Sequence, residues 1–397
     1  MYRAHVSFIP CFFGQNNSFC NHQLTFFFLD FTARPILAIF IPQGQIETEL
    51  AAILEGMSHD HATSTIDPKE VEASQREKLG RFYKRPLPFH ETPTDISLVM
   101  LGLELDKQAR TSEGETLRAI VEKDIGKYSD HRVVAMVAPS GSGKTATVVD
   151  IANRHFVIYC VCCIPSPTIS PGFKDPNFIT LAEDVERIYT AVIQRNKGSS
   201  RELPDIDSEV KADVGERVKI EFLARLLFLQ HLLDHNRALE PQQFFREQIN
   251  GGASTITNLV NKLQEYDYRT IRAMLSQVQT NIRRFLQPRG LGVVIALDEA
   301  QIAEIGILPG KLISPFALIR NRDALLDDKN QIKQEYRRGF LTPLSATLSS
   351  MQATLVILGT ALSLQNADHV YSAIAKQTNF SRITDFPKFD EDDGMFV

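Results

Sequence analysis

The stretch RVVAMVAPSGSGKTATVVD, residues 132–150, decides the fold of this chain. Its first six residues form a β-rich apolar run, and the residues from Thr145 onward have the spacing of a helix. A strand, a short loop of small residues and a helix are therefore expected to follow one another. That order is typical of an α/β protein with a parallel sheet.

The loop within this stretch has the spacing of a phosphate-binding loop in its relaxed form, because an alanine stands where the strict form has glycine. Two glycines let the backbone turn tightly, so that successive N–H groups point into one anion-sized hollow at a helix N-terminus. Lys144 is expected to reach the β- and γ-phosphates of a nucleotide, and the Thr145 hydroxyl to bind Mg²⁺. The predicted nucleotide-binding residues of the loop are Ala138, Pro139, Ser140, Gly141, Ser142, Gly143, Lys144 and Thr145.

The alternative interpretation of this loop is a Gly/Ser-rich turn that ends in Lys-Thr by chance. An apolar β-run lies directly before the loop and a helical pattern directly after it. This is the context that the motif requires. We therefore favour phosphate binding.

A second apolar run, VVIALDEAQ at residues 293–301, ends in two acidic residues. A strand that delivers Asp298 at its carboxyl end places a carboxylate where ligands of open α/β sheets bind. Asp298 is expected to hold Mg²⁺, and Glu299 to polarise an attacking water as general base. Taken alone, Asp298 would more simply cap a helix; its combination with the loop favours the metal role.

A third run, residues 354–360, ends in Thr360. Its hydroxyl is a candidate catalytic group beside the γ-phosphate or the attacking water, and capping of a following helix is an equal alternative. A phosphoryl-transfer site also needs an arginine, but each candidate between the second and third runs reads more simply as a solvated surface charge. These candidates are Arg320, Arg322, Arg337 and Arg338.

The rest of the chain predicts how the domains are organised. Between the first two motifs, residues 208–288 have an almost continuous helical pattern, which we interpret as a helical insertion between the loop-bearing strand and the Asp298 strand. The predicted organisation is an N-terminal segment of unclear status at 1–55, a linker or extended arm at 56–95, a P-loop NTPase domain at 96–378 and an acidic tail at 379–397.

Composition narrows the classes of protein. The net charge of −5 argues against a surface dominated by nucleic-acid contacts, and the basic helix near residues 262–289 reads more simply as a solvated face. No run has the roughly 18 to 20 apolar residues of a membrane span.

Five cysteines, an odd number, indicate reduced thiols in an intracellular compartment, cytoplasm or nucleus. Cys160, Cys162 and Cys163 read as core residues rather than metal ligands.

With these motifs, the chain resembles the P-loop ATPase module of Crinkler-type and retrotransposon-hotspot-like proteins. The resemblance runs from about residue 80 to the end and is carried by VVAMVAPSGSGKTATVVDIANRHFVIYC, DPNFITLAEDVERIY, VVIALDEAQ and LVILGTALSL. It implies an AAA/STAND-like ATPase core that binds ATP and Mg²⁺. It also implies, for some members, a role as a secreted effector in a host cell nucleus.

Three functions remain open on the sequence alone. The first is an Mg²⁺-dependent ATPase. The second is a nucleotide-gated interaction module, acting through a homo-oligomer or a protein partner, and it is favoured because little sequence follows Thr360 for a helical lid. The third, an ATPase acting on nucleic acid, is the weakest because of the net charge.

Overall fold

The computed structural model describes residues 43–55, 132–138, 142, 144–164, 175–250, 252–315, 317, 325, 327, 332–359 and 379–384. All of them belong to the unit Ile41–Val397. The linker predicted at 56–95 and the acidic residues after 384 lie outside the described residues.

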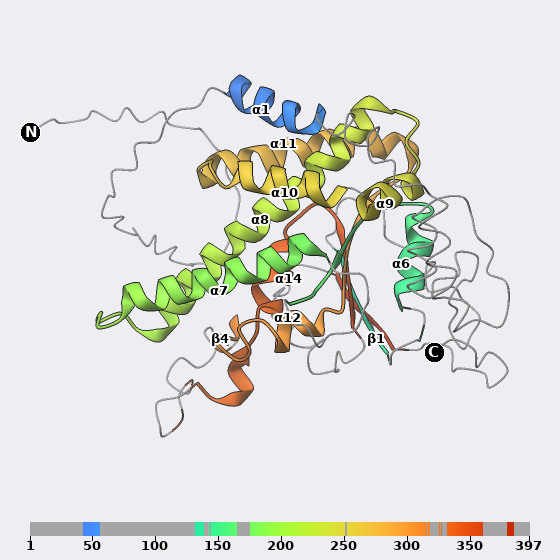
Figure 1. The fold of residues 1–397 in the computed structure, drawn as a ribbon. Helices are drawn as coiled ribbons and strands as arrows, with labels where there is room; N and C mark the ends of the chain where they lie inside the picture. Colours follow the sequence, from blue (N-terminus) through green and yellow to red (C-terminus); the bar gives the residue numbers. More distant parts are fainter. Residues whose placement is uncertain are drawn as a thin grey trace, which may run out of the picture. The chain divides into compact units, whose positions relative to one another are not determined.

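A parallel sheet of five strands lies at the centre of this unit, in the order β2-β3-β6-β1-β7 (Figure 1). Four of the strands are short continuous apolar runs, as expected for strands that are covered on both faces. The protein is therefore an α/β protein with a parallel sheet flanked by helices. The strands are β1 (Arg132–Val137), β2 (Phe156–Val161), β3 (Val293–Asp298), β6 (Thr354–Gly359) and β7 (Asn379–Ile383).

Alternate residues of each strand face opposite layers of helices. Ile295 and its neighbour Leu355 belong to the larger core, whereas Ala296 and its neighbour Val356 belong to the smaller one. The smaller core lies under α6 (Lys144–Ala152), which directly follows the predicted phosphate loop. Figure 1 shows α6 on one side of the sheet and three helices on the other, α7 (Pro176–Asn196), α8 (Leu203–His235) and α14 (Leu341–Ser349). The residues at the ends of the strands are thus held between two layers.

Most of the residues described between β2 and β3 are helical. Residues 208–288 are almost entirely helical, as their pattern predicted, and a further helix precedes them; it begins at Pro176, where Asp175 accepts hydrogen bonds from the backbone N–H groups of Asn177 and Phe178. Phe222, Leu226, Leu229 and Leu233, which recur at helical spacing in this stretch, are buried. The elements are α7 (Pro176–Asn196), α8 (Leu203–His235), α9 (Pro241–Asn250), α10 (Gly252–Leu263), α11 (Tyr268–Leu286) and the 3₁₀ turn η1 (Gln287–Arg289).

The boundary predicted at residue 379 is wrong. Residues 379–383, assigned to an acidic tail, form β7, which pairs in parallel with β1. Ile383 is buried in the smaller core and Phe380 packs against the larger one, so the strand contributes to both faces. Two apolar residues among polar ones gave too weak a pattern for a strand to be recognised.

The N-terminal segment predicted at 1–55 ends in a helix, α1 (Gln43–Glu55). Ile46, Leu50 and Leu54 are buried in the larger core. Glu49 accepts a hydrogen bond from Tyr266, over 3.0 Å, and its carboxylate lies 2.8 Å from the Lys262 ammonium. This helix therefore packs on α10 and the turn after it.

Short elements lie between β3 and β6. Those that the structure describes are α12 (Gln301–Ile305), β4 (Leu312–Ile313), the 3₁₀ turn η3 (Gln334–Tyr336), β5 (Arg337–Arg338) and α14 (Leu341–Ser349). Across the described ranges, no helix combines the length and apolar content needed to cross a membrane.

Candidate functional site

The predicted site residues lie where the parallel strands end. Ala138 follows β1, Asp298 is the last residue of β3, and β1 and β6 end in register, with Val137 opposite Gly359. Carboxyl ends of parallel strands meet at one edge of a sheet, which is where open α/β folds bind ligands. Thr360, which follows β6, lies outside the described residues, as do Pro139, Ser140, Gly141 and Gly143 of the loop.

Lys144 is the first residue of α6 and only 5% exposed. Its ammonium donates hydrogen bonds to the Ala138 carbonyl, over 2.8 Å, and to the Ser142 hydroxyl, over 3.3 Å. The lysine therefore folds back over its own loop. Burial lowers the pKa of Lys144, and the nearby charges of Asp298 and Glu299 raise it in part.

Thr145 and Asp298 are brought together although they are 153 positions apart. The Thr145 hydroxyl donates to Oδ2 of Asp298 over 2.7 Å. These are the two residues that the sequence predicted as Mg²⁺ ligands. Their oxygens lie close enough for one ion to bind both, and hydroxyl and carboxylate oxygens are the ligand types that Mg²⁺ prefers.

Asp298 is buried, with 5% of its surface exposed, and three neutral donors hold it. Besides Thr145, the Tyr159 phenol donates to Oδ2 over 2.8 Å and the Glu299 backbone N–H donates to Oδ1 over 2.9 Å. Burial raises the pKa of Asp298, while these hydrogen bonds lower it in part. The carboxylate does not cap a helix, because α12 begins after Ala300 and has no side-chain cap.

Tyr159, in β2, was missed by the sequence analysis. Val161 is the register partner of Asp298, and Tyr159 lies two residues earlier, so both Tyr159 and Asp298 face the smaller core. Burial, followed by the charge of Asp298, raises the pKa of Tyr159 well above its ordinary value, so the phenol keeps its proton. The only available signal was a single hydroxyl-bearing side chain within the apolar run FVIYCV.

Glu299 has a backbone conformation that is rare for a residue with a side chain, with φ of 52°. Strain of this kind is often concentrated at functional sites. The Gln301 amide donates to Oε2 of Glu299. Directly after it, the Ala300 N–H donates to the Leu358 carbonyl over 2.8 Å, which links the turn to β6. The structure thus places Glu299 beside Asp298, at the same sheet edge.

The four arginine candidates differ in whether the structure describes them and in how exposed they are. Arg320 and Arg322 lie outside the described residues, and Arg337 is exposed, as predicted. Arg338 contradicts the prediction of a solvated charge, because it is only 7% exposed and donates to the Glu335 and Arg337 carbonyls over 2.8 and 2.7 Å. The reason is the pairing of β5 with β4, which buries Arg338 opposite Leu312. Burial lowers the pKa of Arg338.

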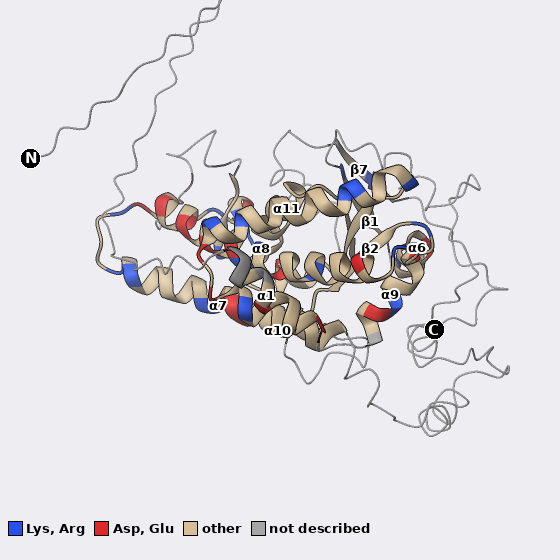
Figure 2. Cartoon of the chain, turned by 90° about the horizontal axis from the view of Figure 1, so that it is seen from above, with Lys and Arg blue, Asp and Glu red and all other residues tan. Residues whose placement is uncertain are grey.

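Two other features of the sequence contribute to the core and to contacts between helices. Cys160, Cys162 and Cys163 are buried free thiols within the larger core, as expected for core packing. On the basic helix α11, Arg272 pairs with Glu216 of α8. Figure 2 shows positive and negative residues mixed over α7 and α8.

A small hollow lies at the opposite ends of the strands. Its lining includes Val293, the first residue of β3, and Ala353, which precedes β6, together with Ile282 and Arg283 of α11. It is therefore separate from the edge at which Asp298 lies. Within the described ranges there is no group of three or more His, Cys, Asp or Glu side chains placed to hold a metal ion.

Comparison of the chain with protein-family models, curated proteins and solved structures found no match.

Proposed function

We propose that this chain is an ATP-binding P-loop protein that works as an Mg²⁺-dependent ATPase. One observation carries the proposal: the hydroxyl that follows the phosphate-loop lysine lies 2.7 Å from a carboxylate 153 positions away. A Gly/Ser-rich turn formed by chance has no reason to meet the acidic end of β3. A loop that binds phosphate and metal requires such a meeting.

The roles follow from the chemistry of each group. Lys144 would contact the β- and γ-phosphates. Because its ammonium is buried and has lost most of its contact with water, binding of an anionic ligand in place of water would be favoured. Thr145 and Asp298 would bind Mg²⁺, which would supply positive charge to offset the negative charge of the nucleotide.

The reaction needs a base beside the attacking water. Glu299 would accept a proton from that water. At the same time the water oxygen would bond to the γ-phosphorus, and the bond from the γ-phosphorus to the oxygen shared with the β-phosphate would break. ADP and inorganic phosphate are the products. Thr360, by its position after β6, remains a candidate group beside the γ-phosphate.

The family assignment is part of the proposal. The resemblance to the ATPase module of Crinkler-type and retrotransposon-hotspot-like proteins supports ATP rather than GTP and an AAA/STAND-like class. The parallel sheet, with the predicted loop after β1 and the acidic pair at the end of β3, is consistent with that class.

Nucleotide binding is tested with Lys144→Ala. The change removes the buried ammonium, and we expect affinity for ATP, measured with a fluorescent ATP analogue on the full chain, to fall about 100-fold or more, as expected for a charge that contacts phosphate directly. Lys197→Ala, at an exposed lysine that ends α7, is the matched control and should bind like the wild type. Equal affinity of the wild type and Lys144→Ala would remove the basis of the proposal.

A second function, the nucleotide-gated interaction module, is favoured by one contact. Gln301 holds the carboxylate of Glu299, the group that hydrolysis would need as a base. In such a module, bound nucleotide would set a conformation and partner binding would be the output.

Glu299→Gln separates the two functions. If Glu299 is the base, the variant should keep ATP affinity but lose turnover by about 100-fold or more, the usual contribution of a general base. Glu183→Gln, at an exposed position of α7, should match the wild type. A wild type that binds ATP without releasing phosphate would select the gated module instead.

A further inference from the structure

Tyr159 lies on the edge strand β2, and side chains of two helices hold its backbone. Its N–H donates to the Gln248 side-chain carbonyl over 2.9 Å, and its carbonyl accepts from Arg225 over 3.3 Å. Gln248 also donates to the Val157 carbonyl over 3.0 Å. Helices α8 and α9 thus cover the open edge of β2, where backbone groups would otherwise lack partners.

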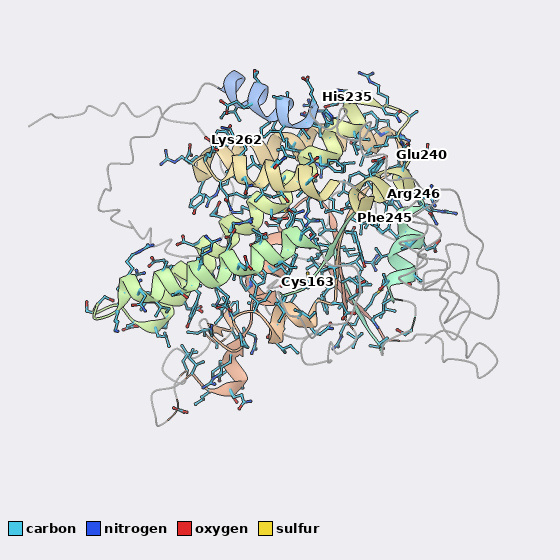
Figure 3. All side chains as sticks on the ribbon, in the orientation of Figure 1. Cys163, His235, Glu240, Phe245, Arg246 and Lys262 are labelled. Carbon is cyan, nitrogen blue, oxygen red and sulfur yellow. The ribbon has the colours of Figure 1, made fainter. Side chains whose placement is uncertain are left out.

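The side chain of Tyr159 is fixed as firmly as its backbone. The residue is 4% exposed, and its ring lies 5.5 Å from that of Phe245 on α9. Figure 3 labels Phe245 beside the sheet. The phenol therefore reaches Oδ2 of Asp298 from a position set by the helices between β2 and β3.

The three donors to Asp298 differ in what a metal ion would do to them. Thr145 is itself a proposed ligand, so binding of Mg²⁺ would turn its hydroxyl from Asp298 to the ion. The Tyr159 phenol and the Glu299 backbone N–H are not proposed ligands. Both would therefore keep their hydrogen bonds to Asp298 when the metal binds. With the metal bound, Tyr159 would be the only side chain still holding Oδ2 among the three donors.

We propose that Tyr159 is a positioning residue, whose phenol orients the Asp298 carboxylate for a divalent cation and which Gln248 and Arg225 hold in place. This inference rests on the proposed function, because it concerns the same metal site. Groups that orient a metal ligand commonly contribute 10- to 100-fold to metal affinity. At this buried position, water cannot easily replace the lost phenol.

The test is Tyr159→Phe in the full chain, with binding of a fluorescent ATP analogue as the readout. In EDTA, affinity should equal that of the wild type, because Lys144 and the loop are unchanged. In an Mg²⁺ titration, the concentration that gives half of the affinity gain should rise about 10-fold or more. Tyr189→Phe, at a half-buried tyrosine of α7, is the matched control and should leave the titration unchanged.

A second variant tests the helical support. Gln248→Met keeps the phenol and removes both side-chain hydrogen bonds to β2, so it should shift the Mg²⁺ titration in the same direction by a smaller factor. An unchanged titration for Tyr159→Phe would overturn the inference while leaving the proposed function intact. Equal losses in EDTA and in Mg²⁺ would also overturn it, since they would show a structural role. A wild type that binds no nucleotide would instead remove the proposed function.

Discussion

The helical layer and the sheet edge each hold a buried carboxylate, Glu221 and Asp298, by different kinds of donor. In the helical layer, Glu221 is fully buried and accepts hydrogen bonds from the Arg225 guanidinium over 3.1 and 3.2 Å. The same guanidinium donates to Asp175 over 2.8 Å. At the sheet edge, the donors to Asp298 are two hydroxyls and one backbone N–H, all of them neutral.

The difference indicates what each region can do. In the helical layer, guanidinium groups of the protein itself lie against the buried carboxylates, so these contacts serve the fold. At the sheet edge, the groups that donate hydrogen bonds to Asp298 are neutral, and the nearby Lys144 ammonium donates to the predicted phosphate loop. A carboxylate kept in that way is suited to an external cation, which is the role proposed for it.

The largest effect on stability should come from removing the arginine that holds the buried carboxylates of the helical layer. Arg225→Met removes the guanidinium and leaves Asp175 and Glu221 buried without it, so we expect the free energy of unfolding to fall by about 3–5 kcal/mol. Urea unfolding followed by circular dichroism measures the change. A loss below about 1 kcal/mol would show that the helical layer does not depend on this compensation.

The control for Arg225→Met is an exposed ion pair. Arg195 lies 3.0 Å from Glu209, and its side chain is 54% exposed. Because solvent screens such pairs, Arg195→Gln should change stability by less than about 1 kcal/mol. Comparison of the two variants separates the effect of burial from that of losing an arginine.

The fold was predictable where the strands are continuous apolar runs. β1, β2, β3 and β6 each have that pattern, and alternation with helices indicates a parallel sheet. β7 was missed because an edge strand with only Phe380 and Ile383 facing the cores has no such pattern. Burial of Arg338 was equally hidden, since it depends on a two-residue pairing with β4.

The candidate site was predictable where spacing along the chain encodes it. Lys144 and Thr145 follow from the loop, and Asp298 follows from its place at the end of an apolar run. Tyr159 does not, because its meeting with Asp298 depends on the register of β2 against β3 and on the face that each residue occupies. Neither can be read from one sequence, whereas the structure gives both.

A matched pair of smaller changes sharpens the comparison of the two regions. Glu221→Gln places an amide against Arg225 and Arg217 in a buried position, so we expect the free energy of unfolding to fall by about 2 kcal/mol. Asp298→Asn keeps the shape of the side chain, and the hydroxyl donors can rotate to accept from an amide, so stability should change by less than about 1 kcal/mol.

In nucleotide binding the order of the two variants should be reversed, with the larger effect for Asp298→Asn. Asp298→Asn removes a proposed ligand, so the gain in ATP affinity that Mg²⁺ provides should require about 100-fold more Mg²⁺. Glu221→Gln should titrate like the wild type, because its charge is compensated within the helical layer. If Asp298→Asn destabilised the fold as much as Glu221→Gln and left the Mg²⁺ titration unchanged, Asp298 would belong with the structural carboxylates. The sheet edge would then lose its distinction from the helical layer.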